Sequence, residues 1–491
     1  MQIQSFINSP KNSKADFIFG LVVVNILGLG CLFGYLNIGD IDTDGGIFAA
    51  VAMKDLNGGT LYQTAWENKP PGIIYLVELL FIIIPNKVFA LYALPIIGIL
   101  FLVSAYYNLA YRTTKSLLSS LLYILLILLF TINNRTIGDA LYTEIYGSIF
   151  LVWSLYFINR YKDTNTYKNL YISAFLLGFT FWFKEPFIII IIPFLIYFIA
   201  TVQSVKEIFI ILLYAVIPSL FFLLLLQIND SLIGFLDMIK YNFSFTEAIN
   251  GGVTKMDQLS YIWYHIIEPL KAPFLVLIYY FVKGLINKEN RLETAIQILL
   301  MLGAVAFVMV SPHSFNHYYI PFIILFFCCF ILPFNLKNSY NQHSKIWLII
   351  VLVYSIYKLN DRNEFNFKWK INQYEPDRVS IILNKNKGST LFVDLVDASG
   401  YYVKGNMIYP TFLPVPIAAH FGDNKNGLIN RTRIYNELRT HKPDFLITER
   451  ESSYMYWHIP DQNLYYGNYE KIDSVKANYG KNVFLWKLKQ H

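Results

Sequence analysis

The sequence predicts a mainly α-helical protein that crosses a membrane many times and carries a small α/β domain at its carboxyl end. Hydrophobic residues make up 55% of the chain and charged residues only 15%, whereas soluble domains carry roughly 25% charged residues. Apolar runs of about 17–25 residues, the length that a bilayer core requires, recur through residues 1–359. From residue 360 to 491 the chain becomes polar, with short β-prone runs.

The composition excludes several other classes of protein. The net charge of +7 is spread over short clusters, with no basic face or arm that would hold a nucleic acid. The three cysteines, Cys31, Cys328 and Cys329, each lie in an apolar run, so their spacing supports neither a disulfide framework nor a zinc site. No glycine-rich loop of the nucleotide-binding kind is present. We therefore expect no nucleic-acid partner.

The apolar runs predict about eleven membrane spans. The first run follows Lys11 and Lys14 and has no cleavage site of the A-x-A kind, so it is interpreted as an uncleaved span. The apolar stretch 170–201 is interrupted at Lys184-Glu185-Pro186 and is interpreted as two short helices that meet at a charged apex. The other predicted spans lie at residues 17–36, 88–110, 116–132, 143–159, 207–228, 272–287, 293–311, 318–335 and 346–359.

The basic residues of the loops predict the orientation of the chain. Lysine and arginine concentrate in loops on the cytoplasmic side of a membrane. With the amino terminus in the cytoplasm, every second loop is rich in these residues and the loops between them are poor. An odd number of spans then places residues 360–491 outside, on a plasma or inner membrane. The predicted inner loops carry Arg112, Lys115, Arg160, Lys162, Lys168, Lys206, Lys283, Lys288, Arg291, Lys337 and Lys345.

The carboxyl-terminal part is predicted to form one small α/β domain. Its β-prone runs lie at residues 390–394, 444–448 and 483–486, and polar helical stretches such as 427–440 alternate with them. A length of about 125 residues suits one hydrophobic core. The aromatic residues Tyr454, Tyr456 and Trp457 are interpreted as core and surface aromatics, with stacking on sugars as the alternative.

The first outer loop carries an unusual set of charges. Three carboxylates, Asp40, Asp42 and Asp44, stand directly after the first span. An amphipathic segment at residues 47–56 follows and ends at Gly58-Gly59. A second apolar segment ends at residue 84 and is short for a span, so we expect it to lie along the membrane interface.

These charges suit one kind of chemistry at a membrane surface. A carboxylate can take the proton of an acceptor hydroxyl, and a cation can stabilise a departing phosphate. The phosphate headgroup of a lipid carrier lies at the depth of this loop, and Lys69 stands beside the stiff pair Pro70-Pro71. The alternative for the aspartates is a solvated loop flank or a helix N-cap, with Asp44 well placed to cap the following segment.

The same loop resembles a known family of enzymes. The residues concerned are Asp44, Phe48 and Ala52 at helical spacing, then Gly58-Gly59-x-Leu61-Tyr62, then Lys69-Pro70-Pro71. This order resembles the dolichyl-phosphate-mannose protein mannosyltransferase family, which is glycosyltransferase family 39, and its bacterial relatives such as the lipid A aminoarabinose transferases. The resemblance implies a GT-C-like membrane fold with juxtamembrane helices in the first outer loop.

The resemblance also implies roles for single residues. Asp44 falls on the family's catalytic aspartate, the general base. Gly45 stands where the family usually has glutamate, which leaves open whether Asp42 or Asp40 shares that role. Asn68 stands where some relatives have an acidic residue that can hold a metal. No cofactor is therefore predicted with certainty, and a divalent metal stays open.

Further positions match the family later in the chain. Glu144 resembles the family's second acidic position, with Asp139 as a competitor and a plain interfacial glutamate as the alternative. Four basic residues are candidate ligands of the donor phosphate. For Lys184 the alternative is simple neutralisation by Glu185, for Arg135 a solvated loop position, and for His317 a structural role. The four candidates are Lys69, Arg135, Lys184 and His317.

The predicted function is an inverting glycosyltransferase that moves a sugar from a polyprenyl-phosphate carrier to an acceptor hydroxyl at the outer face of the membrane. One base suffices for a single displacement, whereas retention needs a second carboxylate as nucleophile. The acceptor, which is a lipid, a glycan or a protein, stays open. Two alternatives are a transporter or flippase of a lipid-linked sugar, which would show two related halves, and a scaffold whose outer domain binds partners.

Overall fold

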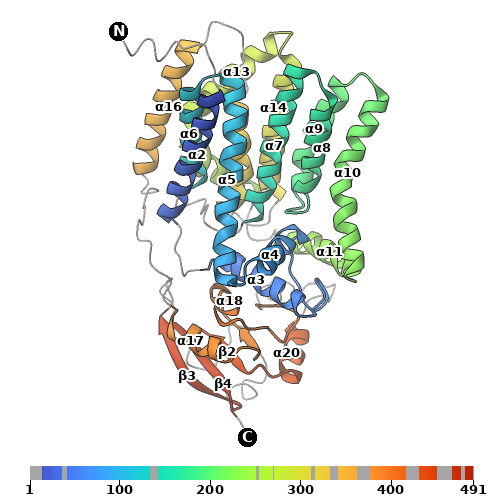
Figure 1. The fold of residues 1–491 in the computed structure, drawn as a ribbon, viewed down its shortest axis with the longest axis vertical. Helices are drawn as coiled ribbons and strands as arrows, with labels where there is room; N and C mark the ends of the chain where they lie inside the picture. The colour runs from blue at the N-terminus through green and yellow to red at the C-terminus, as the bar shows by residue number, and fades with distance from the viewer. Residues whose placement is uncertain are drawn as a thin grey trace.

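The structure, a computed structural model, has three layers along its long axis. Long helices form a bundle at one end, short helices follow, and a small sheet domain lies at the other end (Figure 1). The structure describes residues 14–35, 41–132, 142–249, 254–268, 270–310, 316–331, 341–361, 376–415, 431–449, 467–476 and 482–489.

A helix occupies each predicted span. Within the described residues four of these helices, α2, α5, α10 and α14, are long and apolar enough to cross a membrane. The chain is therefore an integral membrane protein, and the number of crossings stays a prediction. The helices are α2 (Lys14–Tyr35), α5 (Lys87–Thr114), α6 (Leu117–Thr131), α7 (Thr143–Thr164), α8 (Tyr167–Thr180), α9 (Phe187–Thr201), α10 (Val205–Ile228), α13 (Lys271–Ile286), α14 (Arg291–Val310), α15 (Ile320–Ile331) and α16 (Asn341–Asp361).

Polar side chains set where several of these helices begin. Asn86 caps α5 by accepting a hydrogen bond from the amide of Phe89 at 3.0 Å. Ser204 caps α10 in the same way, through the amide of Glu207. Such caps satisfy amide groups that have no partner inside the helix.

Ion pairs join helix ends at the end of the bundle away from the sheet domain. Arg112 of α5 lies 2.9 Å from Asp163 of α7, and Lys162 of α7 lies 2.7 Å from Glu293 of α14. Three of the loops predicted to face the cytoplasm, those that follow α5 and α7 and the one that precedes α14, therefore lie at the same end of the bundle (Figure 1).

Short helices lie between the bundle and the sheet domain. The first outer loop forms α3 (Thr43–Leu56) and α4 (Pro71–Ile83), as its amphipathic and apolar segments predict. Helix α4 exposes Leu79, Ile82 and Ile83, which suits a helix that lies in a membrane interface. The sequence did not predict α11 (Leu232–Ile249), α12 (Lys255–Ile262) and the short turns η1 (Trp263–Ile267) and η2 (Asn316–Tyr319).

The carboxyl-terminal domain contains a mixed four-stranded sheet in the order β1-β2-β4-β3. Strands β1 and β2 are parallel, and β4 pairs antiparallel with β2 and with β3. The three β-prone runs became β1, β2 and β4, and the stretch 427–440 contains α20. The elements are α17 (Arg378–Lys385), β1 (Leu391–Val393), η4 (Val396–Ala398), α18 (Tyr401–Gly405), α20 (Arg431–Thr440), β2 (Phe445–Thr448), β3 (Tyr469–Lys476) and β4 (Asn482–Leu488).

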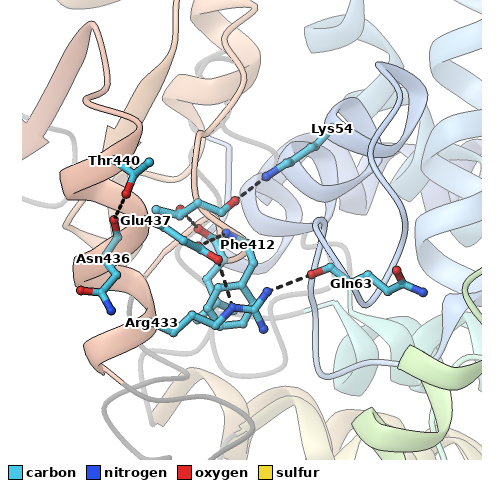
Figure 2. A network of polar contacts seen from close by, with 9 residues as sticks. Lys54, Gln63, Phe412, Arg433, Asn436, Glu437 and Thr440 are labelled. Carbon is cyan, nitrogen blue, oxygen red and sulfur yellow. Dashed lines mark hydrogen bonds and ion pairs between the residues drawn. The ribbon is translucent and has the colours of Figure 1, made fainter.

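This domain is bonded to the first outer loop. The hydroxyl of Ser399 donates to the carbonyl of Thr43 at 2.9 Å, and the amide of Trp66 donates to the carbonyl of Phe412 at 2.9 Å. The ammonium of Lys54 donates to the carbonyl of Thr411. Figure 2 shows part of this network, in which Lys54 and Gln63 of the first loop reach the carboxyl-terminal domain. Helix α3 is consequently enclosed, with residues 45–53 buried.

The three cysteines carry free thiols, and Cys328 and Cys329 are buried in α15.

Candidate active site

The first outer loop is docked on the break between α8 and α9. The amide of Gly72 donates a hydrogen bond to the carbonyl of Trp182 at 2.9 Å. A Cβ atom at position 72 would lie 2.4 Å from that carbonyl oxygen, so only glycine allows this approach. The side-chain amide of Asn242 in α11 donates to the carbonyl of Asn68 at 2.8 Å and to Glu185 at 2.7 Å. Helix α11 thus holds the loop and the break together.

The charged apex of the break forms a buried ion pair. Lys184 is 5% exposed and pairs with Glu144 of α7, which is 1% exposed. The ammonium of Lys184 also lies 3.8 Å from the ring centroid of Tyr318. Glu144 is therefore a buried partner of Lys184 and does not sit at a solvated interface.

Glu185 has a different partner from the one that its position suggests. It accepts its hydrogen bond from Asn242, while the direct ion pair of Lys184 is with Glu144. The neighbour in sequence is thus not the residue that forms the salt bridge with Lys184.

His317 joins the same cluster from η2. Its Nε2 atom lies 3.9 Å from a carboxylate oxygen of Glu144. Its ring stacks on Tyr142 with 4.2 Å between centroids. It is also within electrostatic range of Asp44 and Lys69. The structure therefore brings the candidate histidine to the candidate carboxylates and lysines.

Lys69 faces this cluster from the first loop. Its ammonium donates to the side-chain oxygen of Asn68 at 2.9 Å, and its carbonyl accepts from the hydroxyl of Tyr62 at 2.8 Å. Burial on its own would lower the pKa of Lys69. The acidic groups around it, Tyr318 and Glu67 first, outweigh burial and raise that pKa above its ordinary value. Lys69 therefore keeps its positive charge.

Glu67 is a part of the site that the sequence analysis did not select. Burial raises the pKa of this carboxyl to about 7, the charge of Lys69 opposes the rise, and the charge of Asp44 adds to it. Its place two residues before Lys69 was the only signal in the sequence. A carboxyl group with a pKa near neutrality beside a lysine is typical of functional sites.

Asp42 and Asp44, which stand at the start of α3, have different roles. Asp42 is the N-cap of α3, and its carboxylate accepts a hydrogen bond from the amide of Gly45 at 2.8 Å. Asp44 lies in the first turn of α3, where the helix dipole favours a negative charge. Its charge acts on Lys69, Glu67 and His317. The capping role that was considered for Asp44 therefore belongs to Asp42.

Some candidates cannot be placed relative to this cluster. Asp40, Arg135 and Asp139 lie outside the described residues, as do Tyr454, Tyr456 and Trp457. In the described part of the chain, no group of three or more histidine, cysteine, aspartate or glutamate side chains is arranged to hold a metal ion. Asn68 is the position at which the sequence left a metal ligand open, and its side-chain oxygen accepts a hydrogen bond from Lys69.

Comparison with protein families gives one match. Residues 68–226 match the model of the dolichyl-phosphate-mannose-protein mannosyltransferase family. The predicted resemblance to this family is confirmed. The matched segment contains Lys69, Glu144 and Lys184, whereas Asp44 and His317 lie outside it.

Two solved structures share the fold of the chain. They are crystal structures of ArnT from Cupriavidus metallidurans, one bound to undecaprenyl phosphate and one in the apo state. Each has a TM-score of 0.55, and each match covers 94% of this chain and 97% of the ArnT chain. The sequence identity is 10% for the bound structure and 9% for the apo structure. No curated protein matches the chain.

Proposed function

We propose that this protein is an inverting glycosyltransferase that uses a polyprenyl-phosphate-linked sugar. The proposal is supported most by the docking of the first loop, which carries Asp44 and Lys69, on the α8–α9 break, and the charge of Asp44 helps to raise the pKa of Lys69. The match to the mannosyltransferase family supports the class of reaction. The ArnT structure with bound undecaprenyl phosphate supports the class of carrier.

In the proposed reaction Asp44 takes the proton of the acceptor hydroxyl. The oxygen then attacks the anomeric carbon of the donor sugar, and the bond from that carbon to the phosphate oxygen breaks. The electron pair leaves with the polyprenyl phosphate. One displacement inverts the anomeric centre and needs a single base.

The cations of the cluster stabilise the phosphate as its charge grows. Lys69 is the main candidate because its surroundings keep it charged. Lys184 has its charge balanced by Glu144 in the structure, so it contributes once the phosphate competes for it. His317 lies beside this pair, and Arg135 stays a candidate for the same task.

We also propose the orientation that the loop charges predict. The amino terminus then lies in the cytoplasm, and the carboxyl-terminal domain lies outside with the first outer loop. In this arrangement the reaction takes place at the outer face of the membrane, where a carrier phosphate and an acceptor both arrive.

Substitution of the base tests the proposal. Mass spectrometry of the lipids that co-purify with the protein identifies the carrier. Purified full-length protein in lipid nanodiscs is then supplied with the sugar-linked form of this carrier. Asp44→Asn should lower sugar transfer by a factor of about 10²–10⁴, the usual contribution of a general base, and leave membrane insertion intact.

Asp42→Asn is the matched control. Asparagine is as good an N-cap as aspartate, so α3 keeps its start while the carboxylate is removed. This variant should retain activity. Near-normal transfer by Asp44→Asn, or loss of transfer in Asp42→Asn alone, would contradict the assignment of Asp44 as the base.

A further inference from the structure

A cavity of about 270 Å³ lies between the first loop, α11 and the carboxyl-terminal domain. The first loop contributes Tyr62, Gln63 and Trp66, α11 contributes Asp237, and α20 contributes Arg433. Pockets for drug-sized ligands measure roughly 300–1,000 Å³. This cavity is near the lower limit and suits a group the size of a sugar ring.

Aromatic side chains form one wall of the cavity. The rings of Trp66 and Tyr241 meet edge to face, with 5.0 Å between centroids and an interplanar angle of 90°. Tyr62 is supported behind by Phe235 at 5.7 Å. Such side chains combine an apolar ring with a polar tip. They match a sugar ring, which has a face of C–H groups and a rim of hydroxyl groups.

The polar groups of the cavity are suited to a neutral ligand. Gln63, Asp237 and Arg433 offer both donors and acceptors to hydroxyl groups. The two charges already have partners, because Asp237 lies 2.9 Å from Lys240 and Arg433 lies 3.0 Å from Glu437. A phosphate would therefore find both charges of the cavity lining already paired.

The walls of the cavity are fixed before a ligand arrives. Tyr62 has a φ angle of +64°, in the left-handed region that favours glycine. Its neighbour in α11 is Gly234, where a Cβ atom would lie 2.8 Å from the Cβ of Tyr62. On the other side the guanidinium of Arg433 donates to the carbonyl of Gln63 at 3.2 Å and lies 3.7 Å above the ring of Phe412 (Figure 2).

The cavity is connected to the candidate active site through the first loop. The hydroxyl of Tyr62 donates to the carbonyl of Lys69 at 2.8 Å. The charge of Glu67, which follows Trp66 in the chain, acts on Tyr241 in the wall. A ligand in the cavity is thus separated from the reactive groups by this short segment of chain.

We propose that this cavity binds a sugar ring of the acceptor and holds it beside the reaction centre. The proposal rests on the proposed function. The donor phosphate belongs at Lys69 and Lys184, and its lipid tail belongs among the membrane helices. The cavity instead has a wall from the carboxyl-terminal domain, on the side from which a water-exposed acceptor approaches.

Two reactions of the protein, sugar transfer and donor hydrolysis, distinguish an acceptor site from a donor site. Full-length protein in membrane vesicles receives a panel of synthetic undecaprenyl-phosphate hexoses and pentoses that are radiolabelled in the sugar. Transfer is the label that appears in the endogenous acceptor of the vesicles. Hydrolysis is the label released when water replaces the acceptor, and it needs only the donor.

The variants are Asp237→Ala and Trp66→Leu, with Trp66→Phe to restore an aromatic ring and Leu236→Ala as the control. Leu236 lies next to Asp237 in α11 and is 49% exposed. We expect Asp237→Ala and Trp66→Leu to lower transfer by about tenfold or more while hydrolysis stays within about twofold. Trp66→Phe should recover most of the transfer, and Leu236→Ala should resemble the native protein.

The other outcomes overturn the proposal in different ways. Unchanged transfer in both cavity variants means that the cavity binds no part of the acceptor. An equal fall of transfer and hydrolysis would assign the cavity to the donor sugar. If the native protein neither transfers nor hydrolyses any donor of the panel, the proposed glycosyltransferase function itself is wrong.

Discussion

At the scale of single residues, Glu67 and Lys69 control how much positive charge the first loop offers to a phosphate. Glu67 is largely neutral below pH 7 and ionised above it, because burial raises its pKa to about 7. Lys69 keeps its charge throughout this range because its pKa is raised as well. Ionised Glu67 therefore competes with the carrier phosphate for Lys69.

This competition predicts the pH dependence of donor binding. The KM for the donor should rise as pH increases from about 6 to 8, since the ionised form of Glu67 grows through its pKa of about 7. In Glu67→Gln the rise should be absent, because the amide does not titrate. Initial rates at several donor concentrations and pH values measure the effect.

The same ionisation affects folding with a defined sign. The folded-state pKa of Glu67 lies above its ordinary value of 4.5. The folded protein therefore binds more protons between these two values, and its free energy of unfolding falls as pH rises through them.

A Glu67→Gln protein with the native pH profile of KM would show that Glu67 does not act on the donor.

The residue scale is also where the sequence predicted the site least completely. Lys184 and Glu144 were each selected, yet their ion pair joins positions 40 residues apart, which only the packing of α7 on the break could reveal. Glu67 was overlooked because its raised pKa arises from burial beside Lys69 and Asp44. Asp42 and Asp44 could be separated only once the first residue of α3 was known.

At the scale of elements, the contact of α4 with the break between α8 and α9 places the loop charges. It depends on Gly72, where the main chain of α4 touches the carbonyl of Trp182. An alanine at position 72 would place its methyl group against this carbonyl oxygen. Because the oxygen belongs to the main chain, the backbone of α4 or of the break would have to move.

Gly72→Ala should therefore lower transfer by about tenfold or more, since small misplacements of reacting groups cost large factors in rate. Its melting temperature should fall as well. The control is Gly30→Ala in α2, where a Cβ atom would meet nothing within 4 Å. Transfer rates and thermal unfolding of the purified variants decide the matter, and native behaviour of Gly72→Ala would show that the break tolerates a shifted α4.

Elements were predictable where one simple pattern dominates. Long apolar runs gave the bundle helices, and apolar β-prone runs gave β1, β2 and β4. Strand β3 was missed because it is a mostly exposed edge strand with charged residues, a composition that protects sheet edges. Helix α11 was missed because Asp237 and Lys240 interrupt its apolar residues. Its Asn242 bonds Asn68 and Glu185, which lie far away in the chain.

At the scale of the whole molecule, the bundle has two chemically different ends. One end is closed by ion pairs between helix ends, and the other carries the first loop and the sheet domain (Figure 1). From the positive-inside distribution of the loops we propose that the first end faces the cytoplasm.

Labelling from outside the cell tests this orientation. Lys387→Cys follows α17 in the sheet domain, and Lys288→Cys lies between α13 and α14, and both positions are exposed. A membrane-impermeant maleimide should label intact cells or spheroplasts at position 387 and should label position 288 only after the membrane is opened. The native protein, in which Cys328 and Cys329 are buried and Cys31 is half-buried, serves as the blank. The reverse pattern would place the candidate site in the cytoplasm.

The carboxyl-terminal domain contacts the first loop largely through main-chain atoms of the loop. Arg433 bonds the carbonyl of Gln63, Ser399 bonds the carbonyl of Thr43, and the amide of Trp66 bonds the carbonyl of Phe412. The contacts at positions 63 and 66 use main-chain atoms of the loop, so they persist with any side chain there except proline at position 66, which has no amide hydrogen. Evolution can therefore exchange the side chains that face an incoming molecule without resetting the path of the loop. Selectivity for the incoming molecule can therefore change while the catalytic groups keep their positions.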